Sequence, residues 1–217
     1  GPHLCSFAQS RLDTGFDPSG RGAQVRADEY VLRVTPWSDG RFTLEVGKFA
    51  TRIGGWSERH HSWENPFVNA PLPYEAPTRV SDLLVPLTSQ SFRHVQGSDK
   101  YEFLPLIWGP VYTAGVAISG RLGIFEYAAE LKNASPASRP ETWSDYDFAR
   151  PAVDLRIGLQ PNEAWRLGFS AAEGSYLRPD AQPPVSASKL GDYREILLGQ
   201  DVSYARGHFQ LWAEAFE

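Results

Sequence analysis

The sequence lacks several features that would place it in common protein classes. It has one cysteine, Cys5, so an internal disulfide framework is excluded. It has no run of about 18 apolar residues, which excludes a transmembrane helix. Its 26 acidic and 21 basic residues give a net charge of −5. That balance argues against a nucleic-acid partner, because proteins that bind phosphate backbones carry a basic patch.

Methionine is absent too, and no secretory signal is recognisable. The last residues, 209–217, still alternate between apolar and polar where the chain stops. We therefore expect a piece cut from a longer protein. Its localisation then has to be inferred from the pattern of its strands.

What the chain does have is period-two alternation, clearest over 109–133. Tyr112, Val116 and Ile118 fall on one side of an extended chain, with small residues between them. Past a tight break at 120–123, apolar and charged residues alternate again. This pattern predicts a hairpin with one apolar face, and each arm has about the 9–10 residues that a tilted strand needs to cross a bilayer.

Similar alternation predicts eight strands in all. They lie at about 24–35, 42–53, 109–119, 124–133, 152–160, 165–173, 194–204 and from 209 onward, with 1–21 as a loop. Short connections at about 36–41, 120–123, 161–164 and 205–208 alternate with long ones near 54–110, 134–150 and 174–193. In an up-and-down barrel alternate connections emerge on the same rim, with the short ones periplasmic.

The sequence therefore predicts an all-β fold: an antiparallel up-and-down transmembrane β-barrel in the bacterial outer membrane. Residues 1–217 would form a single domain, a section of about eight strands from a larger barrel, with 54–110 as a long loop insertion. Alternation is also typical of a half-buried sheet in water. A soluble β-sandwich that binds carbohydrate through Trp56 and Trp63, and a barrel for adhesion or assembly, remain as alternatives.

Short stretches resemble a known group of proteins. Residues 44–54, LEVGKFATRIG, are similar to a strand-and-loop segment of porin-like outer-membrane proteins, a group that includes the phosphate-selective porin type. FVNAPLPYE, WGPVYTAGVAISG and YAAELKNAS look like the same general class. The resemblance implies a β-barrel channel of 12–18 strands and does not fix the solute.

The face predicted to line the pore carries charged residues. We assign Glu45, Glu126, Glu130, Lys132, Asp154, Arg156 and Arg166 as pore-lining. Glu29, Glu195, Asp201, Glu214 and Arg33 share this face, so acidic residues outnumber basic ones. A phosphate-selective channel should show the opposite balance. We expect a general or mildly cation-preferring passage for small hydrophilic solutes or ions.

The 54–110 loop would fold inward and set the size cutoff. Trp56, Arg59, His60 and Trp63 are its candidate constriction or ligand-contact residues. Zinc is not expected, because His60 and His61 are adjacent rather than four apart on a helix. No Gly-x-Ser-x-Gly elbow is present, so we expect neither an enzyme nor a cofactor. The expected partners are outer-membrane lipid and small solutes, with a homotrimer left open.

Overall fold

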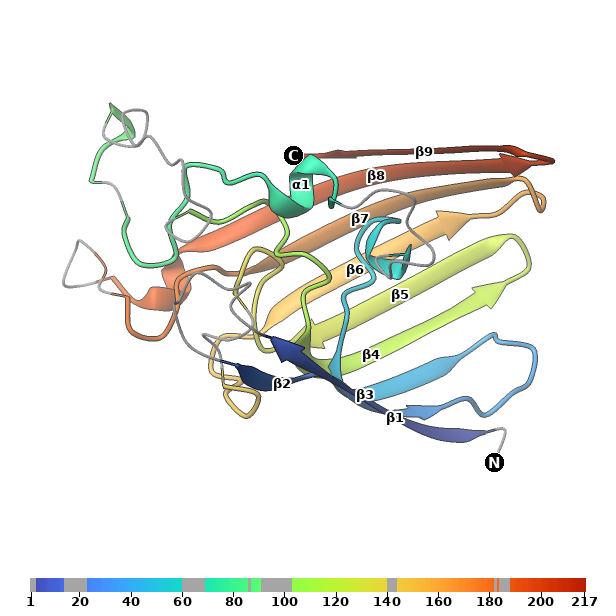
Figure 1. The fold of residues 1–217 in the computed structure, drawn as a ribbon, viewed down its shortest axis with the longest axis horizontal. Helices are drawn as coiled ribbons and strands as arrows, with labels where there is room; N and C mark the ends of the chain where they lie inside the picture. Colours follow the sequence, from blue (N-terminus) through green and yellow to red (C-terminus); the bar gives the residue numbers. More distant parts are fainter. Residues whose placement is uncertain are drawn as a thin grey trace.

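The computed structural model describes residues 3–13, 23–59, 69–85, 87–90, 103–139, 144–181, 183 and 188–217. Nine strands form one antiparallel sheet in which each strand pairs with the next along the chain (Figure 1). They are β1 (Leu4–Asp13), β2 (Gln24–Val34), β3 (Thr43–Phe49), β4 (Thr113–Leu122), β5 (Phe125–Lys132), β6 (Ala152–Leu159), β7 (Trp165–Ser175), β8 (Arg194–Arg206) and β9 (Phe209–Phe216).

Helix is scarce in the described ranges. A four-residue helix, α1 (Leu72–Glu75), and two 3-10 turns, η1 (Ser57–Arg59) and η3 (Leu190–Asp192), lie in the long connections. None of the helices described is long and apolar enough to cross a membrane.

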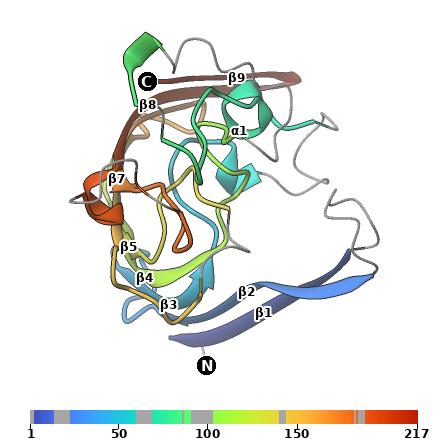
Figure 2. The same ribbon diagram turned by 90° about the vertical axis from the view of Figure 1, so that its left-hand side faces the viewer.

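The predicted all-β, antiparallel up-and-down organisation is confirmed. The sheet bends into an arc with β1 at one end and β9 at the other, and it does not close (Figure 2). Described parts of the long connections, α1 among them, lie inside the arc (Figure 2). The arc therefore has a convex outer face and a concave inner face.

The assignment of residues 1–21 to a loop was wrong, and the count of eight strands was one too few. Leu4–Asp13 forms β1, paired with β2 from Leu4↔Val34 to Asp13↔Gln24. The register shifts at Gln9 and Ser10 because β2 carries one extra residue there, Asp28, that has no partner in β1. Along β1 itself, Leu4 and Leu12 share a face with Ser6 and Ser10, so apolar and polar residues do not alternate clearly in the sequence.

The connections divide between the two rims as the sequence predicted. Short turns join β2 to β3, β4 to β5, β6 to β7 and β8 to β9, and they lie together at one end of the sheet (Figure 1). The long connections 50–112, 133–151 and 176–193 belong to the opposite end, as does 14–23 between β1 and β2.

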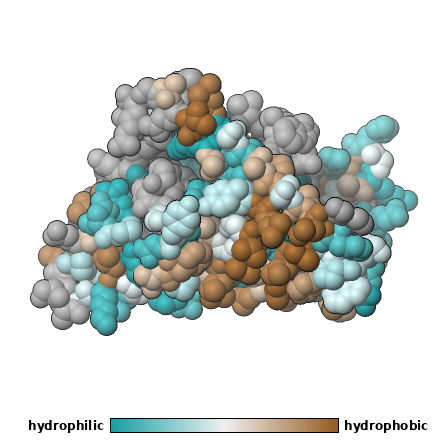
Figure 3. All heavy atoms as spheres, turned by 90° about the horizontal axis from the view of Figure 1, so that it is seen from below, coloured by the Kyte–Doolittle hydropathy of each residue, from teal (hydrophilic) through white to brown (hydrophobic). Residues whose placement is uncertain are grey.

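In a water-soluble protein the apolar face of a sheet is buried, but here the charged face is buried and the apolar face is exposed. Along β6, Ala152, Asp154 and Arg156 are buried, while Leu155 and Ile157 are 50% and 63% exposed. The same holds on neighbouring strands, where Val116, Ile118, Leu131, Leu167, Phe169 and Leu198 are exposed. A brown, hydrophobic area covers part of the face seen from below (Figure 3). The outer face is therefore apolar and the concave face polar.

β3 ends four residues before the predicted boundary of 53. Gly47 has a φ of +137°, a backbone conformation that only glycine adopts readily. A Cβ at this position would run into the carbonyl oxygen of Tyr30 on β2. From Ala50 onward the chain leaves the sheet and turns onto the concave face.

We expect Gly47→Ala to destabilise the fold by about 1–3 kcal/mol, because it combines a disfavoured backbone conformation with a backbone clash. Gly40→Ala is the matched control, since Gly40 also has positive φ (+71°) but open space around its Cα. Urea titrations followed by circular dichroism would measure both. Equal losses for the two variants would contradict the close approach of β2 at Gly47.

Candidate functional site

The concave face holds the charged residues that the sequence analysis assigned to a pore. Glu45, Glu130, Asp154 and Arg156 are each less than a tenth exposed, and Lys132 is fully buried. Burying charge is costly unless each group has hydrogen-bonding partners. The partners come from neighbouring strands and from the segment that follows β3.

Residues 50–55, which we call the crossing segment, run over the concave face from β2 toward β9. Near β2, the amide of Ala50 donates to Glu29 (3.1 Å). Over β5 and β6, Thr51 Oγ1 donates to Glu130 (3.0 Å) and contacts Asp154 (3.4 Å). The amide of Arg52 donates to the other oxygen of Glu130 (3.1 Å). Glu130 and Asp154 are directly opposite each other across β5 and β6, so one short segment reaches both carboxylates.

Farther along, the crossing segment reaches the last strands. The amide of Gly54 donates to Ser170 Oγ on β7 (3.3 Å), and the amide of Gly55 donates to Glu214 on β9 (3.1 Å). Backbone amides thus act as donors to side chains of the sheet at successive points. The crossing segment is held in place by polar bonds rather than by apolar packing alone.

Lys132 joins both ends of the 50–112 connection. Its Nζ donates to the carbonyls of Phe49 (2.7 Å) and Val111 (3.1 Å) and lies 4.5 Å from the centre of the Phe49 ring. The amide of Thr51 donates to Pro110 (2.9 Å) and closes the same neck. Lys132 also interacts electrostatically with Glu130 and Asp154, so this one side chain interacts with both the 50–112 connection and the buried acidic pair.

Ion pairs neutralise several other charges of this face. Glu45 accepts from Arg33 Nη2 (2.6 Å) and pairs with Arg52. On the next strands Arg156 pairs with Asp201, with Nη2 2.8 Å from Oδ1, and Arg166 pairs with Glu126 (2.7 Å). Guanidinium groups therefore pair with Glu45, Glu126 and Asp201, while Glu29 and Glu195 accept from backbone amides.

A polar cavity of about 200 Å³ lies on the concave face near the short turns. Arg52, Arg121, Arg156, Arg166 and Glu126 contribute to its wall, together with small residues of β3 to β5. Since three of these arginines already bind carboxylates, the wall is an array of ion pairs. Such a surface can be solvated and offers both donors and acceptors to a polar solute.

At the β9 side, the loop is fixed by Glu214 and Tyr74. Tyr74, on α1, donates to Glu214 (2.6 Å) and stacks 4.5 Å from Trp56. Burial, reinforced by the negative charge of Glu214, raises the pKa of Tyr74, so the phenol remains a proton donor. Arg59 lies 3.9 Å from Glu214 and 4.5 Å above the Trp212 ring.

Three of the long connections contact one another at Asp82, at the end of the sheet opposite the short turns. Its carboxylate pairs with Arg139 of the 133–151 connection (3.4 Å), and its carbonyl accepts from the amide of Arg178 (3.1 Å). Burial raises the pKa of Asp82, while Arg139 and Arg178 oppose that shift. This contact ties the 50–112, 133–151 and 176–193 connections to one another.

All seven residues predicted to line a pore lie on the concave side, in β3, β5, β6 and β7. Trp56 and Arg59 lie in the loop on the same side, but Trp56 is buried against Tyr74. His60, His61 and Trp63 lie outside the described residues. Thr51 and Arg52 were missed, because the alternation of β3 was extended through them as strand.

Tyr74 was also missed, since it was not among the predicted site residues. The signal was weak: a single tyrosine in the proline-rich stretch 71–77. Within the described ranges, no group of three His, Cys, Asp or Glu side chains is placed to hold a metal ion. Comparison with protein-family models, curated proteins and solved structures found no match.

Lys132→Met should loosen the crossing segment and cost about 3–5 kcal/mol, because it leaves Glu130 and Asp154 buried without their lysine partner. Hydrogen exchange at the amides of Arg52 and Gly54 would report the loosening directly. Arg121→Met, at an exposed position, is the control and should leave both amides protected. Unchanged exchange in Lys132→Met would contradict the assigned role of this lysine.

Proposed function

We propose that this chain is a section of a porin-like channel in the bacterial outer membrane, which passes small hydrophilic solutes or ions by passive diffusion. The observation that carries the proposal is the distribution of side chains over the two faces. Charged groups are buried and paired on the concave face, while large apolar side chains are exposed on the convex face. This distribution suits a wall with hydrocarbon outside and water inside.

The outer face supports a lipid environment. Exposed apolar side chains recur on consecutive strands, for example Ile118 on β4, Leu131 on β5, Leu155 on β6 and Phe169 on β7. Contiguous apolar surfaces of this kind are rare on soluble monomers. A β-sandwich would bury this face against a second sheet, whereas the described residues form one sheet.

Strand length and terminal aromatics agree with that environment. Strands of seven to thirteen residues cover the range that a tilted strand needs to cross the hydrocarbon core. At the short-turn end, Trp165 stacks on Tyr204 (4.6 Å), and Tyr204 lies 6.0 Å from Phe209. Aromatic rings of this kind form girdles at the level of the lipid headgroups.

The concave face supports passage of hydrophilic solutes. Its ion pairs, among them Arg156–Asp201 and Arg166–Glu126, leave no large excess of one sign, which fits a general channel better than a selective anion filter. The crossing segment and α1 occupy part of the concavity and would narrow the passage. Because Trp56 is buried under Tyr74, its ring is not offered to a sugar, and a constriction role is favoured over carbohydrate binding.

Closure of such a barrel would require strands beyond the nine. Eight successive antiparallel pairings leave β1 and β9 running in the same direction. Direct pairing of these edges would be parallel, so an entirely antiparallel wall needs an odd number of strands between them. Further residues of the same protein or another chain could supply these strands.

We expect Leu155→Arg to destabilise the membrane-inserted protein by about 2–4 kcal/mol, and Leu122→Arg by only about 0–1 kcal/mol. Leu155 lies at mid-strand on the outer face of β6, whereas Leu122 is at the end of β4 beside a turn. Both are at least half exposed, so packing within the protein does not distinguish them. Unfolding titrations in lipid vesicles would measure the difference, and equal costs would speak against a bilayer around this face.

Current measurements across a planar lipid bilayer distinguish a channel from a barrel that serves adhesion or assembly. We expect stepwise currents with weak charge selectivity from the wild-type protein. Glu214→Ala, which removes the acceptor of Gly55 and Tyr74, should give larger and noisier steps because the loop is less firmly held. Glu173→Ala, at an exposed site on β7, is the control. Absence of current from protein shown to be inserted would rule out the transport proposal.

A further inference from the structure

A polar side chain lies at mid-strand among the apolar residues of the outer face on β7 to β9. Gln200 on β8 lies in the same row as Leu198 and Val202, and its cross-strand neighbours are Phe169 on β7 and Ala215 on β9. The side chain is exposed, and it makes no hydrogen bond to another residue in the part of the chain that the structure describes. The amide thus keeps its donors and its acceptor available, while its nearest neighbours on this face are apolar.

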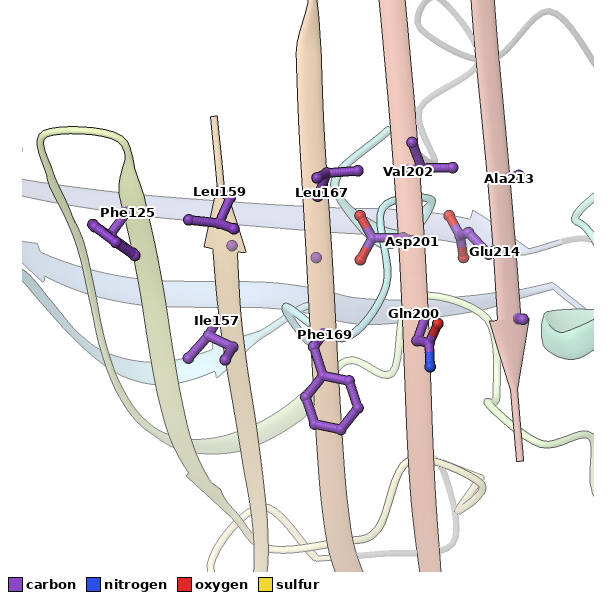
Figure 4. Close-up of a pocket in the computed structure, with 13 residues that line it drawn as sticks. Phe125, Ile157, Leu159, Leu167, Phe169, Gln200, Asp201, Val202, Ala213 and Glu214 are labelled. Carbon is purple, nitrogen blue, oxygen red and sulfur yellow. The ribbon is translucent and has the colours of Figure 1, made fainter. Parts of the chain in front are cut away.

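Beside Gln200 the outer face is hollowed. The depression has a volume of about 590 Å³ and a largely apolar lining that includes Leu167, Phe169, Val202, Ala213 and Ala215. Figure 4 shows Gln200 next to Phe169, with Leu167, Val202 and Ala213 in the adjoining row. The small side chains of β9 leave the hollow open, and the ring of Phe169 forms part of its wall.

Acyl chains cannot satisfy an amide, because they have neither donors nor acceptors. A second copy of the chain can, since it presents the same group. If a two-fold axis passes beside Gln200, each amide can donate to the other and accept from it. The alanines of β9 would allow close approach of the two backbones, as small residues do between elements packed in a membrane. Phe169 of each copy could then enter the hollow of the other.

We propose that the outer face centred on Gln200 is a contact between two copies of this chain in the membrane, with the two Gln200 amides hydrogen-bonded to each other. The inference rests on the proposed function, which places this face in the bilayer. A two-fold contact is self-complementary and yields a dimer. It therefore differs from the homotrimer considered for the sequence, which would need two different surfaces at each contact.

Cross-linking in lipid vesicles tests the contact. In a Cys5→Ser background, which removes the single exposed cysteine, Gln200→Cys should form disulfide-linked dimers on mild oxidation. Ile118→Cys, on the outer face of β4 and four strands away, should remain monomeric. A lipid-borne quencher should reach a label at position 118 and should be excluded from position 200.

The outcomes separate the two proposals. If the quencher reaches both positions and no dimer forms, lipid covers Gln200 and the contact is overturned while the membrane proposal stands. If the quencher fails to reach position 118, the membrane proposal itself is wrong. In the native-cysteine protein, Gln200→Leu should weaken dimerisation by roughly ten- to a hundredfold, because it removes both hydrogen bonds of the amide pair and one such bond in a membrane corresponds to about three- to tenfold. Gln200→Asn should restore part of it, and unaltered dimerisation of Gln200→Leu would contradict the amide pair.

Discussion

The need to keep buried charges paired governs the organisation of this protein. Glu130, Lys132 and Asp154 lie on adjacent strands with almost no exposure to solvent. Each would be strongly destabilising without partners. The crossing segment donates to Glu130 through Thr51 and the amide of Arg52, and to Asp154 through Thr51. Lys132 donates to Phe49 and Val111, at the two ends of the connection that contains the crossing segment. Sheet and loop therefore stabilise each other.

This constraint explains why apolar residues are found outside. Because the concavity is filled by polar side chains and a hydrogen-bonded loop, the apolar side chains of the strands can only point outward. The buried apolar groups of the interior are small clusters, such as Ile53, Trp56 and Ile107 against Leu197. A soluble sheet of this size would place its largest aliphatic side chains in one core. In the proposed function, a hydrocarbon environment around the convex face accounts for the reversal without a second sheet.

The strands could be predicted from sequence where alternation was strict. β6 was placed to within one residue, because Val153, Leu155 and Ile157 alternate with charged or small residues. β1 could not be found, since Ser6 and Ser10 share a face with Leu4 and Leu12 and its apolar alternation is weak. An inward course was predicted for the loop, but its contacts could not be: nothing local in Thr51 or Tyr74 signals that their hydroxyls contact carboxylates 79 and 140 residues away. Alternation specifies faces, whereas such long-range polar contacts depend on the fold as a whole.

Spin labels placed one at a time along β6 in lipid vesicles test the central claim most directly. Oxygen, which concentrates in hydrocarbon, should reach labels at 153, 155 and 157, while labels at 154 and 156 should be shielded from it. The account predicts a period of two that follows the alternating exposure of these residues. Oxygen accessibility without that period, or with its maxima at 154 and 156, would contradict an outer face that contacts lipid.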